Sequence, residues 1–216
     1  MAGIVVRALI QGRRDLSDFE YLFALFGLLF GLIVAELALR FADAIDSHRV
    51  RPMGILTPAL AFLVLTDMTT YWLFMWGYRA SLHVSFTTVF SGIILAMVYF
   101  LSASLVFPRD GAECARLDDH YFRRKRMVAG GVLFVNVVVI GAMLSRTRPE
   151  WNDWWFYYYF PAYVIALTGL VVSRSRRLDL CFLALALSVN LTSGFDLLPH
   201  SRFGQTTGIV PHASVP

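Results

Sequence analysis

The chain has 216 residues, of which 57% are hydrophobic, 15% aromatic and only 16% charged. Its mean hydropathy of +0.61 exceeds that of soluble domains, and its charges are bunched between apolar runs, which excludes a soluble globule with charges spread along one face of each helix. The formal net charge of +4 is taken as a signal of membrane orientation, so no nucleic-acid partner is expected.

The chain begins with a polar, mildly amphipathic lead-in over residues 1–19, which lacks the apolar core and cleavage site of a signal peptide. The first membrane span is predicted over residues 21–42. Ser17 followed by Glu20 has capping-box spacing, which favours a helix start near Phe19.

Two features of this first span are candidates for packing or function. Gly27, Gly31 and Ala35 recur every four residues and predict close helix packing, either within the bundle or between subunits. Glu36 and Arg40 have i,i+4 spacing in the favourable order near the end of the span. They predict an interfacial ion pair, with a cytoplasmic gate or substrate contact as the alternative.

The second apolar run, residues 55–78, carries one carboxylate, Asp67, at its midpoint. A carboxylate at the centre of a membrane-spanning helix costs roughly 2.5 to 3.5 kcal/mol on insertion scales, so it usually has a partner or a function. Thr70 and Tyr71 share its helix face. We expect Asp67 to be a proton or cation site with these two side chains beside it. The alternative is a protonated or hydrogen-bonded carboxyl group that pins helices together.

Four further apolar runs are long enough to cross a bilayer: residues 84–107, 127–145, 154–173 and 178–198. The six runs predict an all-α, polytopic integral membrane helix bundle, with one membrane domain over residues 20–198 and a polar tail over residues 199–216. Asn136 and Asn190 fall inside the fourth and sixth runs. We expect both amides to line the Asp67 site.

The connections after the first, third and fifth spans hold most of the 19 Lys and Arg residues. The positive-inside rule therefore predicts that these three loops are cytoplasmic and that both termini lie outside. At the end of the third loop, a basic run predicts contact with anionic lipid headgroups: Arg123, Arg124, Lys125 and Arg126. Lys125 is the only Lys, and this preference for Arg is typical of GC-rich bacterial genomes, so we expect a bacterial inner membrane.

Signatures of enzymes and of cofactor sites are absent from the sequence. Cys114 and Cys181 have no metal-binding spacing and are expected to be free thiols. Asp118, Asp119 and His120 lack further ligands, so a solvated loop is expected rather than a metal site. No His lies in a predicted span, and there is no HExxH motif and no set of nucleophile, base and metal ligands. We expect neither an enzyme nor a cofactor.

Two functions fit this sequence. The first is transport or conduction of a small ion or solute, with a proton link at Asp67. The second is a non-catalytic membrane subunit or scaffold that binds a partner protein through its helix faces and basic loops. Six spans are few to enclose a pathway, so a homo-oligomer is expected in the lipid bilayer.

Overall fold

The computed structural model of the chain describes residues 18–46, 54–77, 83–108, 117–145, 148–149, 151, 153, 155–195 and 197. Within these residues all regular secondary structure is helical, so the predicted all-α fold is confirmed. Five helices are long and apolar enough to cross a membrane, and a shorter apolar helix covers Phe156–Val172, as expected of an integral membrane helix bundle. The predictions for Ser17, Cys114 and residues 199–216 lie outside the described part of the chain.

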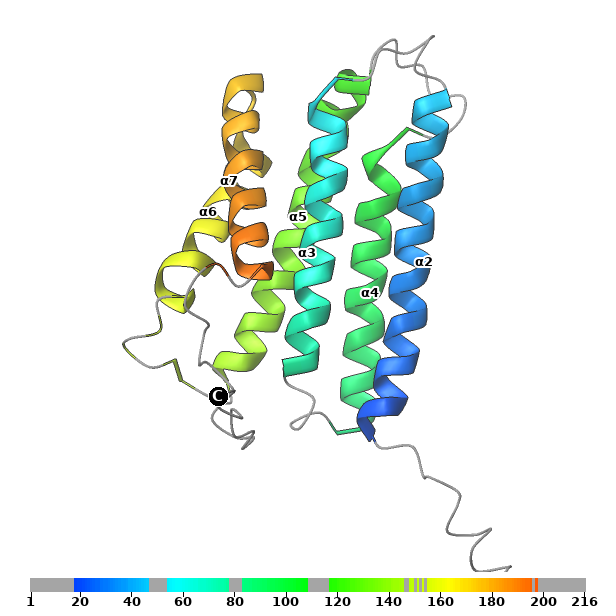
Figure 1. Cartoon of the computed structure of the whole chain (residues 1–216), viewed down its shortest axis with the longest axis vertical. Helices are drawn as coiled ribbons and strands as arrows, with labels where there is room; N and C mark the ends of the chain where they lie inside the picture. Colours follow the sequence, from blue (N-terminus) through cyan, green and yellow to red (C-terminus); the bar gives the residue numbers. More distant parts are fainter. Residues whose placement is uncertain are drawn as a thin grey trace, which may run out of the picture.

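Successive long helices run in opposite directions (Figure 1). In chain order the elements are α2 (Asp18–Asp46), α3 (Leu56–Gly77), α4 (Phe86–Val106), α5 (Leu117–Leu144), the π-helical turn η3 (Trp155–Tyr159), α6 (Phe160–Val172) and α7 (Arg176–Gly194). Helix α3 occupies the centre, because it packs against α2, α4, α5 and α7. The helix that carries Asp67 is therefore the one with the most neighbours to supply polar partners.

Two helices begin at places that the apolar runs did not indicate. Helix α5 begins at Leu117 rather than near residue 127, and its first turn contains Asp118 and Asp119, whose charges favour the positive end of the helix dipole. The predicted fifth span is divided into η3 and α6, with Pro161 in the first turn of α6. Proline lacks the backbone N–H that an α-helical turn needs, so a regular helix begins there rather than passing through it.

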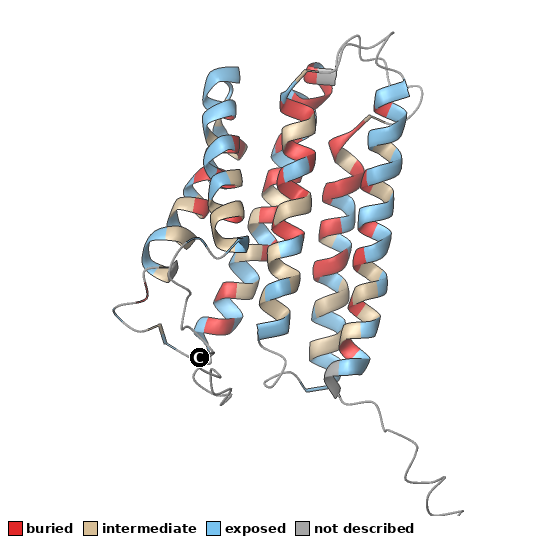
Figure 2. Ribbon diagram, in the orientation of Figure 1, coloured by how far each residue is buried: buried red, intermediate tan, exposed pale blue. Residues whose placement is uncertain are grey.

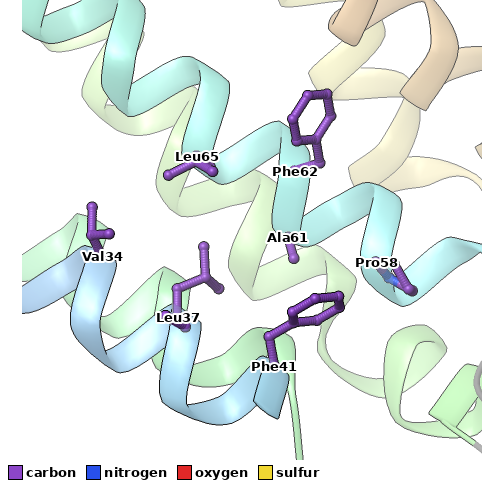
Figure 3. A pocket seen from close by; sticks show the side chains of 8 residues that line it. Val34, Leu37, Phe41, Pro58, Ala61, Phe62 and Leu65 are labelled. Carbon is purple, nitrogen blue, oxygen red and sulfur yellow. The ribbon is translucent and has the colours of Figure 1, made fainter. Parts of the chain in front are cut away.

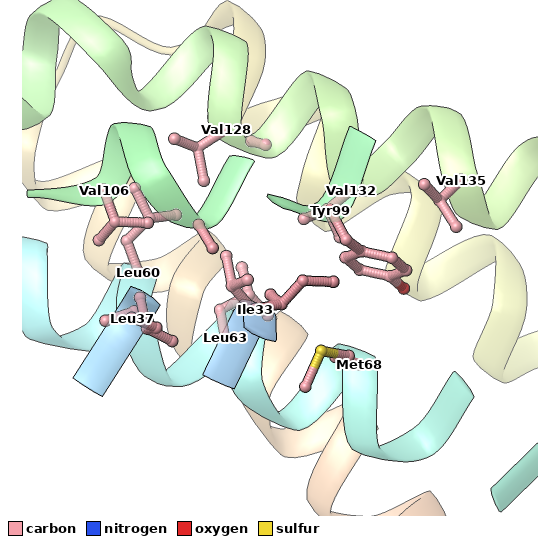
Figure 4. Packing of buried hydrophobic residues seen from close by; sticks show 14 of the residues in the cluster. Ile33, Leu37, Leu60, Leu63, Met68, Tyr99, Val106, Val128, Val132 and Val135 are labelled. Carbon is pink, nitrogen blue, oxygen red and sulfur yellow. The ribbon is translucent and has the colours of Figure 1, made fainter. Parts of the chain in front are cut away.

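Apolar side chains from all six helices form the main cluster between the helices (Figure 4). A smaller cluster joins Ile140 and Met143 of α5 to Phe74, Phe156 and Phe160. The outward faces are also apolar and are exposed along much of their length (Figure 2). Leu28 on α2 and Phe86 on α4, for example, are 66% and 82% exposed. Large apolar side chains on both the inside and the outside are characteristic of helices that pack against each other and against lipid.

Candidate functional site around Asp67

The carboxylate of Asp67 lies buried inside the bundle with hydrogen-bond donors on both of its oxygens. Asp67 is 2% exposed. Tyr163 Oη donates to Oδ1 at 2.5 Å, and Tyr99 Oη donates to Oδ2 at 2.6 Å. Asn136 Nδ2 lies 3.0 Å from Oδ1 and 3.2 Å from Oδ2. A carboxylate offers about four acceptor positions, so these contacts occupy its acceptor capacity.

Each donor to this carboxylate comes from a different helix. Tyr99 lies on α4, Asn136 on α5 and Tyr163 on α6. Asn136 Nδ2 also donates to the backbone carbonyl of Val132, one turn earlier at 3.0 Å, which fixes the direction of the amide. Asp67 therefore joins its own helix to three others through polar contacts in a mostly apolar interior.

The remaining two helices reach the same cluster through its partners. On α7, Asn190 Nδ2 donates to Tyr163 Oη at 3.2 Å and to Thr66 Oγ1 at 3.4 Å. On α2, the centroid of the Phe30 ring lies 6.2 Å from that of the Tyr99 ring, and the two rings meet edge to face. We call Asp67, Tyr99, Asn136, Tyr163 and Asn190 the Asp67 network. The network therefore has hydrogen bonds to α3, α4, α5, α6 and α7, and a ring contact to α2.

Besides Asp67 itself, three of the five predicted site residues reach its carboxyl group, its network or its backbone by hydrogen bonds: Asn136, Asn190 and Thr70. Asn136 contacts the carboxylate directly, and Asn190 contacts it through Tyr163. Thr70 instead donates its hydroxyl to the backbone carbonyl of Asp67 at 2.8 Å, because a threonine hydroxyl readily bonds the carbonyl one turn back in its own helix. Thr70 therefore lies beside Asp67, as expected, and bonds its backbone rather than its carboxyl group.

The fifth predicted residue, Tyr71, packs by its ring. Its centroid lies 5.9 Å from that of Tyr99 and 5.7 Å from that of Phe30. Sequence reasoning missed the two strongest donors, Tyr99 and Tyr163. Their signal was their position inside apolar runs, whereas the tyrosines and tryptophans near the run ends fit an interfacial belt.

The partners of the Asp67 carboxylate are uncharged. Among the described residues no Lys, Arg or His forms an ion pair with it. Tyrosine hydroxyls can donate or accept and can rotate between the two roles. The arrangement can therefore hold an ionised carboxylate with all donors pointing inward, or a protonated one that donates to a rotated hydroxyl. The chemistry of these groups therefore allows one proton to be taken up or released at the carboxyl group.

A second polar cluster lies in the N-terminal half of α5, around Lys125, and corrects one prediction. Lys125 is 1% exposed, and its Nζ donates to Asp179 Oδ1 at 2.7 Å, to Asp179 Oδ2 at 2.5 Å and to the Ser173 carbonyl at 2.8 Å. Lys125 therefore cannot contact lipid headgroups as predicted. Of the basic run, Arg123, Arg124 and Arg126 are exposed, and the headgroup prediction stands only for these three.

We call Lys125, Asp179 and the Ser173 carbonyl the Lys125 clamp. The ammonium group also lies 5.7 Å from the Tyr121 ring centroid and 5.2 Å from that of Phe122, within the range of cation–π attraction. The clamp ties α5 to the turn between α6 and α7. It is a fully desolvated ion pair with an additional carbonyl partner, which is the condition under which a buried pair is tolerated.

The acidic group at the start of α5 is not the solvated loop that the sequence predicted. Because α5 begins early, Asp118 is buried, with Arg176 Nη2 at 3.4 Å. The His120 ring nitrogen Nε2 lies 3.0 Å from the Leu105 carbonyl. Within the described ranges, no three His, Cys, Asp or Glu side chains are gathered as metal ligands. Cys181 is a free, exposed thiol.

The two candidate features of α2 lie at its surface. Arg40 Nε donates to Glu36 Oε1 at 2.9 Å, so the expected pair is present. A side chain at Gly27 would meet the Trp72 ring at 3.5 Å, but one at Gly31 would meet no heavy atom within 4 Å. Ala35 is also exposed. Most of the stripe therefore does not pack within the bundle, and contact between subunits stays a prediction.

No protein-family model, curated protein or solved structure matches the chain.

Proposed function

We propose that the protein is a proton-linked membrane transporter or channel in which Asp67 carries the proton. One observation supports this proposal above the others. Asp67 is a buried carboxylate whose contacts come from uncharged donors on three other helices. Ionisable groups within membrane bundles are rare and typically mark ion or proton pathways.

Protonation would rearrange the contacts between helices. The ionised carboxylate accepts hydrogen bonds from Tyr99, Asn136 and Tyr163. The protonated group has an O–H to donate, so one tyrosine hydroxyl must turn and accept. Since the partners lie on separate helices, the two protonation states favour different helix packing, which is the two-state element that a transport cycle requires.

The proposal includes an orientation. The connections after α2, α4 and α6, together with the helix ends that flank them, face the cytoplasm of a bacterial inner membrane, because they carry 12 of the 19 Lys and Arg residues. The start of α2 and the end of α7 then face outward. Arg123, Arg124 and Arg126 would lie beside the anionic headgroups of the cytoplasmic leaflet.

A pH jump across a solid-supported membrane tests the proposal without knowledge of a co-transported solute. Protons that enter the site give a transient current with the wild-type protein. Asp67→Asn keeps the size of the side chain but cannot take up the proton, so we expect its current to fall to that of protein-free membranes. Glu36→Gln is the matched control, because it neutralises a partly exposed carboxylate on α2, and its current should equal the wild type. A wild-type-like current from folded Asp67→Asn would refute the proposal.

A second function, a scaffold that binds another membrane protein, is favoured by the surface of α2. Gly31 and Ala35 leave its surface smooth, and an apolar groove of about 410 Å³ lies between α2 and α3 (Figure 3). Its lining consists of Val34, Leu37, Ala38, Phe41, Pro58, Ala61, Phe62 and Leu65. A helix of a second protein can approach such a surface closely.

The scaffold function predicts a complex that a bulky residue on this surface would break. Gly31→Leu should abolish cross-linking to the partner or to a second copy in the membrane, and it should leave the fold intact, because no atom lies within 4 Å of the added Cβ. Gly141→Leu is the matched control, since Gly141 on α5 has equally open space. Equal cross-linking in both variants would exclude this surface as the interface, and a pH-jump current lost only in Asp67→Asn would favour transport.

A further inference from the structure

The Asp67 network lies much nearer to one end of α7 than to the other. Asn190 precedes the last residue of α7, Gly194, by about 6 Å along the helix axis. A Cβ at Gly194 would lie 3.7 Å from Thr70 Cγ2, so α7 ends level with Thr70. Helix α3 continues to Gly77, about 10 Å beyond that level (Figure 1). Just past the level of the carboxylate, α3 is therefore no longer covered by helix α7.

Polar or side-chain-free positions line this short stretch. Thr66 and Thr70 on α3 face Asn190 and Gly194 on α7, as shown by the 3.4 Å contact between Asn190 and Thr66 and by the proximity of Gly194 to Thr70. Both threonines are partly exposed. We call these four residues the α3–α7 seam. The hydrogen bonds that begin at Asp67 continue through Tyr163 to Asn190 and Thr66 of this seam, and the Thr70 hydroxyl donates to the backbone carbonyl of Asp67.

The opposite direction is closed by apolar packing. Asn190 and Asp179 are about 16 Å apart along α7, as are Asn136 and Lys125 along α5. Between these levels the interior is filled by apolar side chains that are at most 1% exposed: Val128, Ala129 and Val132 on α5, Ala166, Leu167 and Leu170 on α6, and Leu183 and Ala186 on α7. We call these eight residues the apolar plug. Figure 4 shows Val128 and Val132 of the plug in the same cluster as Leu60 and Leu63 of α3. The Lys125 clamp seals its far end.

The chemistry of the site suits a proton better than a metal cation. The oxygens of Asp67 already accept from two O–H groups and one N–H group, whereas a hard cation needs about six or more oxygens with free lone pairs. The titratable groups around Asp67 are Tyr99 on α4, Tyr163 on α6 and Tyr71 on its own helix. The other helices present residues that do not titrate: Phe30 on α2, Asn136 on α5 and Asn190 on α7.

We infer that Asp67 exchanges its proton with water from one side only, through the α3–α7 seam on the side where α7 ends, while the apolar plug and the Lys125 clamp close the other side. This inference rests on the proposed proton-linked function and specifies its route in this conformation.

Cysteine labelling in sealed vesicles of known orientation tests the route. The background carries Cys114→Ala and Cys181→Ala, and the probe is a small, membrane-impermeant cationic methanethiosulfonate. Leu197→Cys and Arg177→Cys report the two sides, because both positions are exposed at opposite ends of α7. Thr70→Cys and Thr66→Cys probe the seam, and Ala186→Cys and Ala129→Cys probe the plug with small changes in volume.

We expect Thr70→Cys to be labelled only from the side that labels Leu197→Cys, at least tenfold faster than either plug position. Thr66→Cys, which lies deeper, should react from the same side and more slowly. Labelling of Thr70→Cys from the Arg177 side, equal rates at seam and plug, or no labelling of either threonine position would each overturn the route.

The route and the proposed function can fail separately. If Asp67→Asn abolishes the pH-jump current and the seam is labelled from the wrong side, the function stands and the route is wrong. If the labelling pattern holds and Asp67→Asn keeps a wild-type current, water reaches the seam as inferred but the proton-linked function is wrong.

Discussion

Two buried carboxylates of the bundle, Asp67 and Asp179, are stabilised in different ways. Asp179 lies in the first turn of α7, where the helix dipole favours negative charge, and it faces the Lys125 ammonium group at 2.5 and 2.7 Å. Asp67 lies in the middle of α3, where the dipole gives no such help, and its partners are two hydroxyls and one amide. One carboxylate has a compensating charge and the other has only dipoles.

This difference distinguishes a structural ion pair, Lys125–Asp179, from a carboxyl group whose protonation state can change, Asp67. The charge of Asp179 is balanced by the Lys125 ammonium group at contact distance. The charge of Asp67 is held only by hydroxyls and an amide that can reorient. Protonation of Asp67 would therefore change its contacts with three neighbouring helices, which is why we propose the functional group there rather than at the clamp.

The largest effect is expected from breaking the ion pair at one partner. Lys125→Met keeps much of the side-chain volume but leaves Asp179, which is 0% exposed, without its cation. An uncompensated buried charge costs about 3 to 5 kcal/mol of unfolding free energy. Reversible unfolding in mixed detergent micelles, followed by tryptophan fluorescence, measures the loss.

The matched control removes both charges. In Lys125→Met combined with Asp179→Leu no buried charge remains, and similar exchanges of buried ion pairs for apolar residues are often neutral or stabilising. We therefore expect the double variant to recover most of the loss. A single variant as stable as the wild type would mean that Asp179 is not desolvated by the bundle.

A smaller loss is expected when one donor is removed from Asp67. Tyr163→Phe and Tyr99→Phe each delete a hydrogen bond to Asp67. If Asp67 is ionised, each of these bonds is worth about 1.5 to 3 kcal/mol. The loss should be larger for Tyr163, because its hydroxyl also accepts from Asn190 at 3.2 Å. The same unfolding measurement ranks the two variants.

Repeating both substitutions in an Asp67→Asn background sharpens the result. The asparagine amide offers one acceptor oxygen and one NH2 donor, so one tyrosine hydroxyl donates to a neutral oxygen and the other must turn and accept. Each contribution should then fall to about 0.5 to 1.5 kcal/mol. If each Tyr→Phe change lowers the unfolding free energy equally in the two backgrounds, Asp67 is already neutral in the folded protein. Asp67 and Asp179 would then differ in charge as well as in their partners.

The membrane spans and the importance of Asp67 could be predicted from the sequence, because both depend only on the composition along one helix. Apolar runs of sufficient length predict spans, and the energetic penalty of a charge in such a run singled out Asp67. The two main donors, Tyr99 and Tyr163, could not be identified in the same way. Whether a tyrosine inside a span meets lipid or a carboxylate depends on the rotation of its helix and on which helices are neighbours, and neither is encoded in local spacing.

The interpretation of Lys125 failed for a related reason. Four adjacent basic residues look like one patch in a sequence, but successive residues of a helix point about 100° apart. Because α5 begins at Leu117, the run lies within the helix and its members point around the axis. Lys125 faces the bundle, and its three Arg neighbours face outward. The sequence carried one signal of the early helix start, namely the acidic residues Asp118 and Asp119, which are favoured in the first turn of a helix.

The smallest effect is expected at the ion pair of α2, which serves as the solvated counterpart of the Lys125 clamp. Glu36 and Arg40 lie 2.9 Å apart, but their side chains are 22% and 21% exposed, so they keep part of their hydration. A double-mutant cycle with Glu36→Gln and Arg40→Gln should give a coupling free energy of about 0.2 to 1 kcal/mol, which shrinks as salt is added. Because geometry at the two sites is similar and burial differs, a coupling as large as that of the clamp would show that burial does not set the strength of ion pairs in this bundle. A small, salt-sensitive coupling would show that desolvation, and not the N–O distance, gives the Lys125–Asp179 pair its larger coupling free energy.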